Sequence, residues 1–402
     1  MIFVFYFLSA ALAWFSLRSI LGGIAYLRFF QSELAKPPSD YKPFVSVIAP
    51  CRGLDAGLEQ NLTALIEQDY PDYEVIFVVD DIGDLSLSTI RDVSHKAAER
   101  NKKAKLIVAS KSEGCSQKVE NLREAVLDVA AGSKAFVFVD SDARPSKNWL
   151  SSLVAPLEKD GVGGATGYRW FISKNPSFGS ELRSVWNASI ASALGPNTGS
   201  NFCWGGSMAI RRDVFEAVDM REKWRGTLSD DFAVTRAMNT AGRPIVFVPQ
   251  ALTASIENCS LSETFEFTTR QMKITRVYAT SLWVKSLIGS GLFVAVMLTA
   301  FFIVIFNRTN ILPVWASVSV LIFVAACSTG KAWLRLAAVR LVLSGYKTEL
   351  KRQFWTQNTL WLLSPALFLV NSIAALLSRR MTWRGITYEL KSPTETVIIR
   401  GE

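Results

Sequence analysis

The sequence has few of the residues that most often bind metals or staple small folds. Its 402 residues include one histidine, His95, in a charged stretch with helical periodicity, so a histidine base is not expected. The five cysteines show no CxxC pair and no metal-ligand spacing, which argues against a disulfide framework and suits a reducing compartment. No internal repeat or low-complexity tract is evident, so a repeat protein is not expected.

Long apolar runs are abundant by contrast. Half of the residues are hydrophobic, and they gather in runs at 2–26, 284–306, 311–330 and 355–377. Each run is about as long as a helix needs to cross a hydrocarbon core of roughly 30 Å. The first run lacks a basic start and exceeds the apolar core of a signal peptide, so we expect a retained anchor. These runs predict an integral membrane protein with one soluble domain between anchors.

Basic side chains border the apolar runs, and the net charge is +9. By the positive-inside rule, the soluble domain and the basic segment 331–354 are expected to face the cytoplasm. Nucleic acid is the usual alternative partner of a basic chain, but charge that borders membrane spans favours the bilayer, so no nucleic-acid partner is expected. Four full crossings would put the basic tail on the far side. Pro365 favours a broken or re-entrant last helix, so the topology of this run stays open.

Between the first and second apolar runs, the pattern predicts an α/β domain with a mainly parallel sheet. A polar, proline-containing linker leads into apolar strand segments that alternate with segments of helical periodicity, as in a doubly wound sheet. The expected strands are 44–50, 74–79, 104–110 and 134–140, and the expected helices are 56–68, 87–100 and 117–130.

Carboxylates follow two of these strands at their C-terminal ends. Asp80 and Asp81 follow one strand, and Asp140 and Asp142 follow another. The C-terminal edge of a parallel sheet is where ligands bind, and crowded carboxylates repel one another unless a cation joins them. Asp140 and Asp142 alternate along an extended segment, so both can bind one divalent cation, Mg²⁺ or Mn²⁺, that also binds phosphate. Either acid pair alone is also typical of a solvated loop start, whereas the two together favour a metal–nucleotide site.

Six motifs follow one another along the chain: VSVIAPCRGLD, QDYPDYEVIFVVDD, QKVENL, FVFVDSD, GGSMAIRRDVF and SDDF. In this order they resemble the motifs of family-2 glycosyltransferases with the GT-A fold, and the likeness is greatest to ceramide glucosyltransferases. The similarity extends from Val45 to TWRGITYEL in the tail, which is nearly the whole chain. It implies a GT-A nucleotide-sugar-binding domain flanked by N-terminal and C-terminal transmembrane helices.

The resemblance implies a membrane-bound inverting enzyme that transfers a hexose, glucose first, from a UDP-sugar to a lipid hydroxyl. Ceramide is the first acceptor to consider; a hopanoid or diacylglycerol is the alternative, with N-acetylglucosamine as a second donor sugar. A processive polysaccharide synthase and a catalytically silent membrane scaffold are two further hypotheses. A degraded (Q/R)xxRW pattern and only about four spans argue against the synthase, and intact acids in the motifs argue against the scaffold.

The resemblance also implies which residues bind the donor and the metal. They lie in the first four motifs and in the basic segment TTRQMKITRVY. The residues expected at the uracil, ribose, diphosphate, sugar or metal are Pro50, Arg52, Gly53, Asp55, Asp80, Asp81, Lys118, Asp140, Asp142, Arg270 and Lys273. Among them, Lys118 is expected near the diphosphate or ribose, and Asp140 and Asp142 are expected to hold the metal.

The basic segment departs from the family pattern (Q/R)xxRW. Arg270 fits its first position, whereas Lys273 and Ile274 replace the arginine and the tryptophan. A guanidinium fork and an ammonium bind phosphates differently, so contacts do not transfer directly from the ceramide enzymes. Arg270, Lys273 and Arg276 recur every three residues and would form one basic stripe on a helix. Two interpretations stay open, closure over the diphosphate and binding of anionic lipid heads.

Asp231, in SDDF, is expected to be the catalytic base, with Asp230 beside it. One-step inversion needs a base that removes the acceptor hydroxyl proton while the anomeric carbon is attacked from the opposite face. The alternative is that both acids only stabilise the start of the following helix through its dipole. Gly205 and Gly206 let the backbone approach a sugar or acceptor, and Trp204 either stacks on the sugar or fills the core.

The expected organisation has six parts. These are an anchor at 1–30, a linker at 31–43, a GT-A catalytic domain at 44–263, a basic interfacial helix at 264–283, transmembrane or interfacial helices at 284–377, and a tail at 378–402. The expected cofactor is a divalent cation, and the expected partners are a UDP-sugar, a membrane lipid acceptor and the bilayer.

Overall fold

The computed structural model describes residues 2–307 and 310–399. Residue 1 of the expected anchor, residues 308–309 of the expected transmembrane region and residues 400–402 of the expected tail lie outside these ranges. The chain divides into two compact units. The helical unit comprises Met1–Gln31, Asn175–Ser192 and Cys259–Ser378. The sheet unit comprises Ser32–Lys174, Ala193–Asn258 and Arg379–Glu402.

A seven-stranded sheet forms the centre of the sheet unit. Its spatial order is β3 (Lys103–Val108), β2 (Tyr73–Val79), β1 (Val45–Pro50), β4 (Ala135–Phe138), β8 (Met208–Arg211), β6 (Gly164–Thr166) and β9 (Ile245–Phe247). The first four strands pair in parallel, and β8 runs antiparallel to both of its neighbours. β2 and β4 are buried along their whole length, as strands covered on both faces are. The predicted α/β class with a mainly parallel sheet is confirmed.

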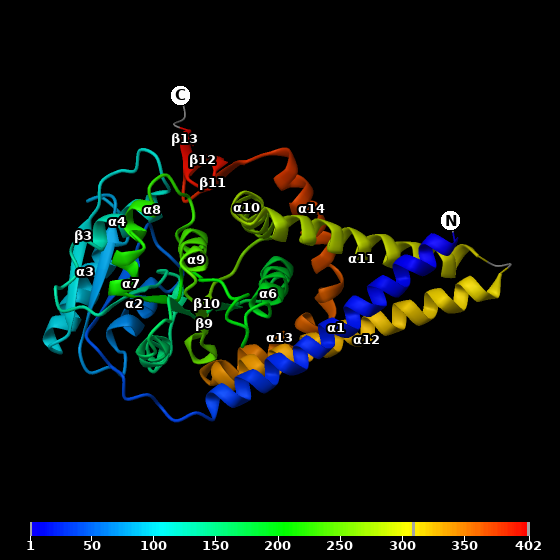
Figure 1. Cartoon of the computed structure of the whole chain (residues 1–402), viewed down its shortest axis with the longest axis horizontal. Helices are drawn as coiled ribbons and strands as arrows, with labels where there is room; N and C mark the ends of the chain where they lie inside the picture. The colour runs from blue at the N-terminus through cyan, green and yellow to red at the C-terminus, as the bar shows by residue number, and fades with distance from the viewer. Residues whose placement is uncertain (1, 308–309, 400–402) are drawn as a thin grey trace. The chain divides into compact units, whose positions relative to one another are not determined.

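Helices alternate with the first strands, as the sequence pattern predicts. Those that follow β1, β2 and β3 in the chain are α2 (Leu58–Ile66), α3 (Leu87–Glu99) and α4 (Gln117–Ala125) (Figure 1). Ser116 caps α4, because its Oγ accepts a hydrogen bond from the Val119 backbone N–H at 3.2 Å. Val119 and Leu122 are fully buried, and α4 packs on β1 and β2. This packing fixes the start of α4 near the C-terminal edge of the sheet.

A second, three-stranded sheet lies in the same unit. Its spatial order is β5 (Ala143–Arg144), β10 (Thr253–Ile256) and β7 (Arg169–Ile172). The remaining α-helices described in the unit are α5 (Trp149–Val154), α7 (Arg212–Ala217), α8 (Met220–Lys223) and α9 (Asp230–Thr240). The acids of SDDF therefore stand in the first turn of α9.

The tail folds into a third sheet rather than a loose extension. Its antiparallel strands are β11 (Arg380–Trp383), β12 (Ile386–Ser392) and β13 (Glu395–Ile399). The Tyr388 side chain is buried, and its hydroxyl accepts a hydrogen bond from the Gln117 backbone N–H at 3.2 Å. A side chain at Gly226 would meet the Thr394 carbonyl oxygen at 2.2 Å, so glycine permits this close approach. The tail is thus an integral part of the sheet unit.

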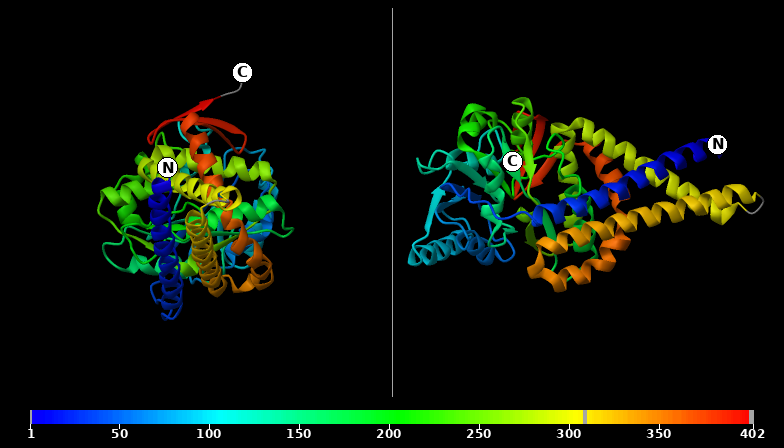
Figure 2. Two further views of the ribbon diagram at one scale, coloured as in Figure 1. Left: turned by 90° about the vertical axis from the view of Figure 1, so that its right-hand side faces the viewer. Right: turned by 60° about the horizontal axis from the view of Figure 1, so that its bottom comes forward.

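Three helices of the helical unit are long and apolar enough to cross a membrane. They are α1 (Ile2–Leu34), α11 (Thr280–Phe306) and α12 (Ile311–Val342). Phe5 and Leu12 of α1 pack with Val296 of α11 and Val324 of α12 in one buried cluster. Figures 1 and 2 show the three helices running alongside one another. Exposed apolar side chains cover their outer surfaces, which a bilayer would shield from water.

The fourth apolar run is not one straight helix. It is divided between α13 (Lys347–Thr359) and α14 (Ser364–Leu377), and the helix pair that contains them is bent by 58°. Pro365 occupies the first turn of α14, where its missing N–H is tolerated. The break lies where Pro365 predicts one. Two further helices, α6 (Phe178–Ala191) and α10 (Leu261–Tyr278), pack against α14.

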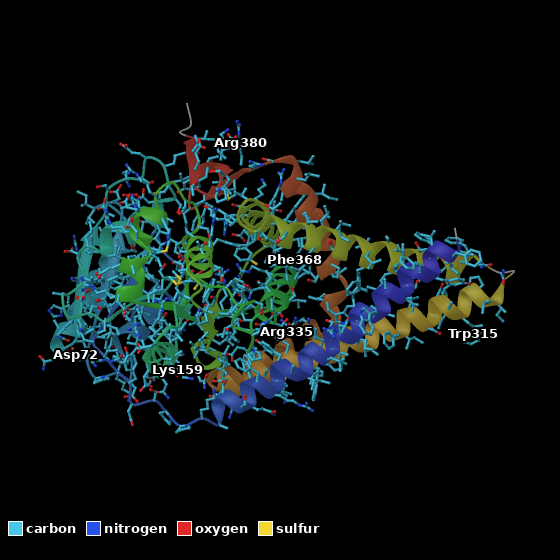
Figure 3. The ribbon with its side chains drawn as sticks, viewed as in Figure 1. Asp72, Lys159, Trp315, Arg335, Phe368 and Arg380 are labelled. Atoms are coloured by element: carbon cyan, nitrogen blue, oxygen red, sulfur yellow. The ribbon has the colours of Figure 1, made fainter. Side chains whose placement is uncertain are left out.

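Polar side chains lie inside the helical unit between α6, α12 and α13. Ser184 Oγ accepts a hydrogen bond from Gln357 Nε2 at 3.0 Å, and Gln357 Oε1 accepts one from Arg335 at 3.4 Å. Figure 3 labels Arg335 on α12 and, further toward the N-terminus of this helix, the exposed Trp315. Bonds between helices satisfy polar groups that an apolar surrounding would otherwise leave unpaired.

We expect Tyr388→Ala to loosen the tail from the sheet unit. Loss of a buried aromatic ring costs about 3–5 kcal/mol, whereas Tyr388→Phe removes only one hydrogen bond, worth about 1 kcal/mol. The melting temperature of the purified protein should therefore fall much further for Tyr388→Ala than for Tyr388→Phe. Limited proteolysis should also cut the tail sooner in the alanine variant. Equal melting temperatures for Tyr388→Ala and the wild type would contradict this account.

Candidate active site

The parallel register brings the residues after β1 and β2 together at one edge of the sheet. Pro50 pairs with Val78, so Arg52 and Asp80, each two residues further on, become neighbours. Arg52 Nη1 lies 2.7 Å from Asp80 Oδ2, and the Asp80 side chain is almost fully buried. A buried carboxylate this close to a guanidinium forms a strong charge-assisted contact. The structure thus joins two of the predicted donor residues.

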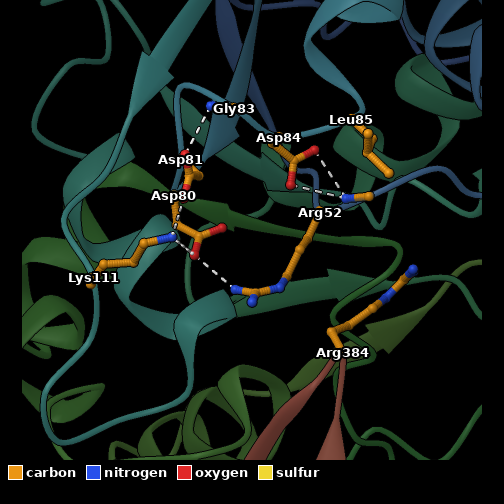
Figure 4. A pocket seen from close by; sticks show the side chains of 9 residues that line it. Arg52, Asp80, Asp81, Gly83, Asp84, Leu85, Lys111 and Arg384 are labelled. Carbon is orange, nitrogen blue, oxygen red and sulfur yellow. Dashed lines mark hydrogen bonds and ion pairs between the residues drawn. The ribbon is translucent and has the colours of Figure 1, made fainter.

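A pocket of about 420 Å³ lies at this edge (Figure 4). Its lining comes from the segments after β1, β2 and β3 and from the tail, and comprises Arg52, Gly53, Asp80, Asp81, Gly83, Asp84, Leu85, Lys111 and Arg384. Lys111 Nζ lies 2.9 Å from Asp80 Oδ2 and 3.1 Å from Asp81 Oδ2. Charged groups of both signs therefore face a space large enough for part of a nucleotide.

Carboxylates hold the backbone that surrounds this pocket. Asp84 accepts hydrogen bonds from the Gly53 backbone N–H at 3.0 and 3.1 Å. Gly53 has a φ of 69°, a left-handed conformation that favours glycine. The Gly83 backbone N–H donates to Asp81 at 2.8 Å, and this bond, with the Lys111 ammonium, lowers the pKa of the Asp81 carboxyl. Asp81 is accordingly kept ionised beside the pocket.

Lys118 joins two of the acidic motifs. Its Nζ lies 2.7 Å from Asp140 Oδ1 and 3.1 Å from Asp230 Oδ1. Burial opposes ionisation of Asp140, but Lys118 and Arg169 lower the pKa of its carboxyl. Burial raises the pKa of Asp230 to about 6. A side chain at Gly205 would lie 2.2 Å from Asp230 Oδ2 and 2.8 Å from Lys118 Nζ, so only glycine leaves room for this ion triad.

Asp142 stands close to Arg169 of β7. Arg169 Nη1 lies 3.4 Å from Asp142 Oδ2, while Asp142 Oδ1 is buried and has no hydrogen-bond partner within residues 2–307 and 310–399. Burial raises the pKa of Asp142 to about 7. A buried oxygen that lacks a donor is costly unless a further cation approaches it. The donor set of Asp140 and Asp142 therefore fits a hard divalent cation that completes its shell with phosphate and water.

Protein groups alone do not enclose such a cation. Across the described parts of the chain, no three His, Cys, Asp or Glu side chains are placed together as a metal site. Two carboxylates with substrate oxygens are nevertheless a usual arrangement for Mg²⁺ at phosphates. The geometry is thus compatible with a cation that binds together with the donor.

Asp55 connects the DSD motif to the tail. Its Oδ2 accepts a hydrogen bond from Ser141 Oγ at 2.6 Å, and its Oδ1 forms an ion pair with Arg384 Nη2. Pro50 ends β1 and is absent from the pocket lining, although its neighbours Arg52 and Gly53 belong to it. Of the residues predicted at the uracil and ribose, Arg52 and Gly53 therefore line the pocket, whereas Asp55 contacts Ser141 and Arg384.

Asp231 lies in the first turn of α9 with its carboxylate held by three donors. Oδ1 accepts hydrogen bonds from the Phe232 backbone N–H at 2.8 Å and from Ser229 Oγ. Oδ2 accepts one from the Gly205 backbone N–H at 3.3 Å. The side chain is half-buried. Both interpretations of this acid, as a base and as a helix-start residue, agree with its position.

The turn formed by Gly205 and Gly206, after Trp204, lies between Asp231 and Asp140, the acid predicted to bind the donor. A side chain at Gly206 would lie 2.8 Å from Asp140 Oδ2 and 2.2 Å from the Trp204 ring. Trp204 is buried, with its ring centroid 5.4 Å from that of Tyr168 and 5.1 Å from the Arg169 guanidinium. The indole thus packs in the core of the unit beside the DSD motif.

Arg270 and Lys273 belong to the helical unit, on α10. The Arg270 guanidinium lies 5.5 Å from the Phe267 ring centroid, and Arg276 Nη1 donates to the Ala375 carbonyl at 2.6 Å. The basic segment is helical, as its three-residue spacing suggests. Its contact with a diphosphate or with lipid heads stays a prediction.

Sequence reasoning missed four residues of this site. Lys111 carried a signal, because it follows the expected strand 104–110 and so had to reach the same sheet edge. Arg384 lies in TWRGITYEL, but nothing local links it to Asp55, 329 positions earlier. Asp84 and Arg169 stand in irregular or short segments whose direction no periodicity reveals.

Acids that follow β2 line a pocket at the edge of the sheet, and Lys118 joins the acid after β4 to the start of α9. Such a charged site is compatible with a transferase that binds a phosphorylated donor. Residues 11–396 match glycosyl transferase family 21, and the chain therefore belongs to that family of glycosyltransferases. The predicted glycosyltransferase class is confirmed, and the family that matches is family 21.

Several solved glycosyltransferases are similar to this chain. The mannosyltransferase PcManGT from Pyrobaculum calidifontis, in complex with GDP-Man and Mn²⁺, is 19% identical over 93% of this chain and 98% of its own, with a TM-score of 0.47. GalNAc-T7 with UDP, GalNAc and Mn²⁺ is 15% identical over 60% and 48%, with a TM-score of 0.44. Glucosyl-3-phosphoglycerate synthase from Mycobacterium tuberculosis, with Mn²⁺ and UDP-glucose, is 15% identical over 62% and 82%, with a TM-score of 0.35.

We expect Lys118→Met to destabilise the sheet unit, because it leaves Asp140 and Asp230 without their shared ammonium. Breaking a buried ion pair costs about 3–5 kcal/mol, which thermal unfolding of the purified protein would register as a clear loss. The double variant Lys118→Met, Asp230→Asn should regain part of the lost stability, because one uncompensated charge is removed.

Lys111→Met is the matched control for Lys118→Met. The Lys111 side chain is 58% exposed, against 15% for Lys118. Without Lys111, Arg52 still pairs with the buried Asp80, and water solvates the exposed Asp81. Its melting temperature should stay near that of the wild type. If the melting temperature of Lys118→Met were not lower than that of Lys111→Met, the buried triad of Lys118, Asp140 and Asp230 would not stabilise the fold.

Proposed function

We propose that the chain is a membrane-bound inverting glycosyltransferase that moves a hexose, glucose first, from a UDP-sugar to a lipid hydroxyl, with ceramide as the first acceptor to test. One observation carries the proposal. The Gly205-Gly206 turn lies close to both acids: the Gly205 N–H donates to Asp231 at 3.3 Å, and a side chain at Gly206 would lie 2.8 Å from Asp140 Oδ2. A base candidate and a donor-side acid therefore both lie next to one glycine turn.

Asp140 and Asp142 would hold a divalent cation together with the donor diphosphate. When bound, the cation would neutralise the negative charge that grows on the departing diphosphate. Asp142 Oδ1, buried and without a hydrogen-bond partner in the described chain, supports this assignment. Lys118 Nζ pairs with Asp140 at 2.7 Å, and Arg169 Nη1 pairs with Asp142 at 3.4 Å, so each acid is held by a neighbouring cation.

Asp231 is proposed as the general base, with Oδ2 as the atom that takes the proton. Oδ1 already accepts two hydrogen bonds, whereas in the described structure Oδ2 accepts the single bond from Gly205. The acceptor oxygen would form its bond to the anomeric carbon while the bond from that carbon to the diphosphate oxygen breaks. Its proton passes to Asp231 Oδ2. Attack from the face opposite the leaving group inverts the anomeric configuration.

Asp230 is less suited to this role. Its Oδ1 is paired with the Lys118 ammonium, and the residue is only 3% exposed. It is proposed as a positioning residue that holds the start of α9, and thus Asp231, next to the glycine turn.

The lipid acceptor is proposed from the order of the chain. In the chain, α1 precedes the first segment of the sheet unit, and α11 and α12 lie between Asn258 and its last segment. A site tethered in this way would meet acceptors that are concentrated in the bilayer interface. The basic segment 331–354 favours a cytoplasmic site by the positive-inside rule, where nucleotide sugars are available. The stripe of Arg270, Lys273 and Arg276 is proposed either to approach the diphosphate or to bind anionic lipid heads.

Asp231→Asn should reduce lipid glycosylation by roughly 10²–10⁴-fold, the usual contribution of a general base. Its affinity for UDP should stay unchanged, because the amide keeps the size of the side chain and lies away from the pocket. Membranes that contain the enzyme would be incubated with radiolabelled UDP-glucose and ceramide, and the organic phase counted. Asp72→Asn, at a surface position labelled in Figure 3, is the matched control and should retain full activity.

The same assay compares donors and acceptors. UDP-N-acetylglucosamine, hopanoid and diacylglycerol arms test the alternative substrates. Label in long polymer without any lipid acceptor would favour a processive synthase. No organic-phase label with any donor and lipid, or an Asp231→Asn variant as active as the wild type, would refute the proposal.

A further inference from the structure

The tail hairpin brings a cation to the donor pocket from the far end of the sequence. Arg384 and Gly385 form the turn between β11 and β12, and both have positive φ, of 50° and 77°. Two left-handed residues are what a tight type I′ hairpin requires, and this suits Gly385 well. A left-handed conformation is unfavourable for an arginine, so the turn itself does not explain why an arginine stands at this position, whereas a contact outside the turn can.

That contact is with the acidic side of the site. Arg384 Nη2 forms an ion pair with Asp55 Oδ1, and Arg384 is one of the residues that line the pocket. Figure 4 shows its side chain extending from the hairpin beside Arg52. The Asp55 side chain is 8% exposed and also bound by Ser141, which lies between the two metal-side acids. Arg384 therefore stands between the pocket and the DSD motif.

The hairpin that carries Arg384 is firmly attached. Tyr388 of β12 is buried against the start of α4, and Thr394 in the β12–β13 turn approaches Gly226 too closely for any side chain there. A guanidinium on such a support is held in place before the ligand arrives, which reduces the entropy lost on binding.

Arg384 remains charged and partly exposed at the edge of the pocket. Burial disfavours its charge, but Asp55, Asp142 and Asp140 raise the pKa of the guanidinium, so it stays protonated. Arg52 and Lys111, the other lining cations, already neutralise Asp80 and Asp81. Arg384 has 42% of its side chain exposed and can present its remaining N–H groups to the pocket. A guanidinium fork binds two phosphate oxygens at once.

We propose that Arg384 binds the diphosphate of the nucleotide-sugar donor, so that the C-terminal hairpin completes the donor site. This role rests on the proposed function, because it requires a nucleoside diphosphate donor. It also explains why the tail packs into the sheet unit although the helices of the other unit separate them in sequence.

Arg384→Gly tests this role. Glycine adopts the left-handed turn without strain, but loss of the guanidinium leaves the Asp55 carboxylate, whose side chain is 8% exposed, without its ion pair, so the melting temperature should fall and binding is measured well below it. Binding of UDP and of uridine to the full-length protein in nanodiscs would be measured by calorimetry and competition in the presence of Mn²⁺. We expect the affinity for UDP to fall roughly ten- to hundredfold, which is the usual range for a charge-assisted bond. The affinity for uridine should not change, because uridine has no phosphate.

Two further variants sharpen the result. Arg384→Lys keeps the charge but loses the fork, so it should bind UDP with intermediate affinity. Arg380→Ala removes an exposed arginine from the same hairpin and should bind UDP like the wild type. Equal loss of UDP and uridine binding in Arg384→Gly would indicate a general disturbance of the pocket and would overturn the role.

The outcome for the wild type separates the two proposals. If it binds UDP and Arg384→Gly binds UDP equally well, only the role of Arg384 is refuted. If the wild type does not bind UDP, the proposed function is refuted, and the role of Arg384 in binding the donor with it.

Discussion

The balance of buried charge at the C-terminal edge of the sheet governs the rest of this site. Asp140 and Asp230 come from segments 90 residues apart and would repel each other if Lys118 did not lie between them, at 2.7 and 3.1 Å. Lys118 is delivered by α4, which starts at the Ser116 cap and packs on β1 and β2 through Val119 and Leu122. The ion triad therefore depends on the core as much as on its own charges, and it ties the donor-side acid to the start of α9.

The same principle extends across the pocket. Arg52 and Lys111 neutralise Asp80, Arg169 approaches Asp142, and Arg384 pairs with Asp55. A site built in this way holds its acids in position by ion pairs that a charged ligand can exchange. A diphosphate with a divalent cation carries both signs of charge, so it can replace such pairs without leaving buried charges uncompensated. This exchange is the physical reason for which we propose a nucleotide sugar, and not a neutral ligand, for the pocket.

Apolar surfaces, and not buried ion pairs, dominate the helical unit. α1, α11 and α12 are long and apolar enough to cross a membrane, and a bilayer would cover the apolar side chains that they expose. The buried cluster that they share, around Phe5 and Val324, is small. Where α13 meets α6 and α12, polar contacts such as Ser184 with Gln357 join the helices instead. The break before Pro365 lets the chain leave the direction of the preceding helix without an unsatisfied proline position inside a helix.

The sequence by itself determined the alternating α/β order, the apolar spans, the break near Pro365 and the acids at the ends of β2 and β4. These follow from periodicity and from the side-chain chemistry of neighbouring residues, which are local properties. The resemblance added the glycosyltransferase class and the candidate roles of the acids, whereas family 21 came from the match over residues 11–396. Only the tertiary structure decided that Lys118 bridges Asp140 and Asp230, and that Arg384 reaches Asp55 across 329 positions. Such partners are chosen by how the tail and α4 pack, and packing depends on long-range contacts that no sequence window contains.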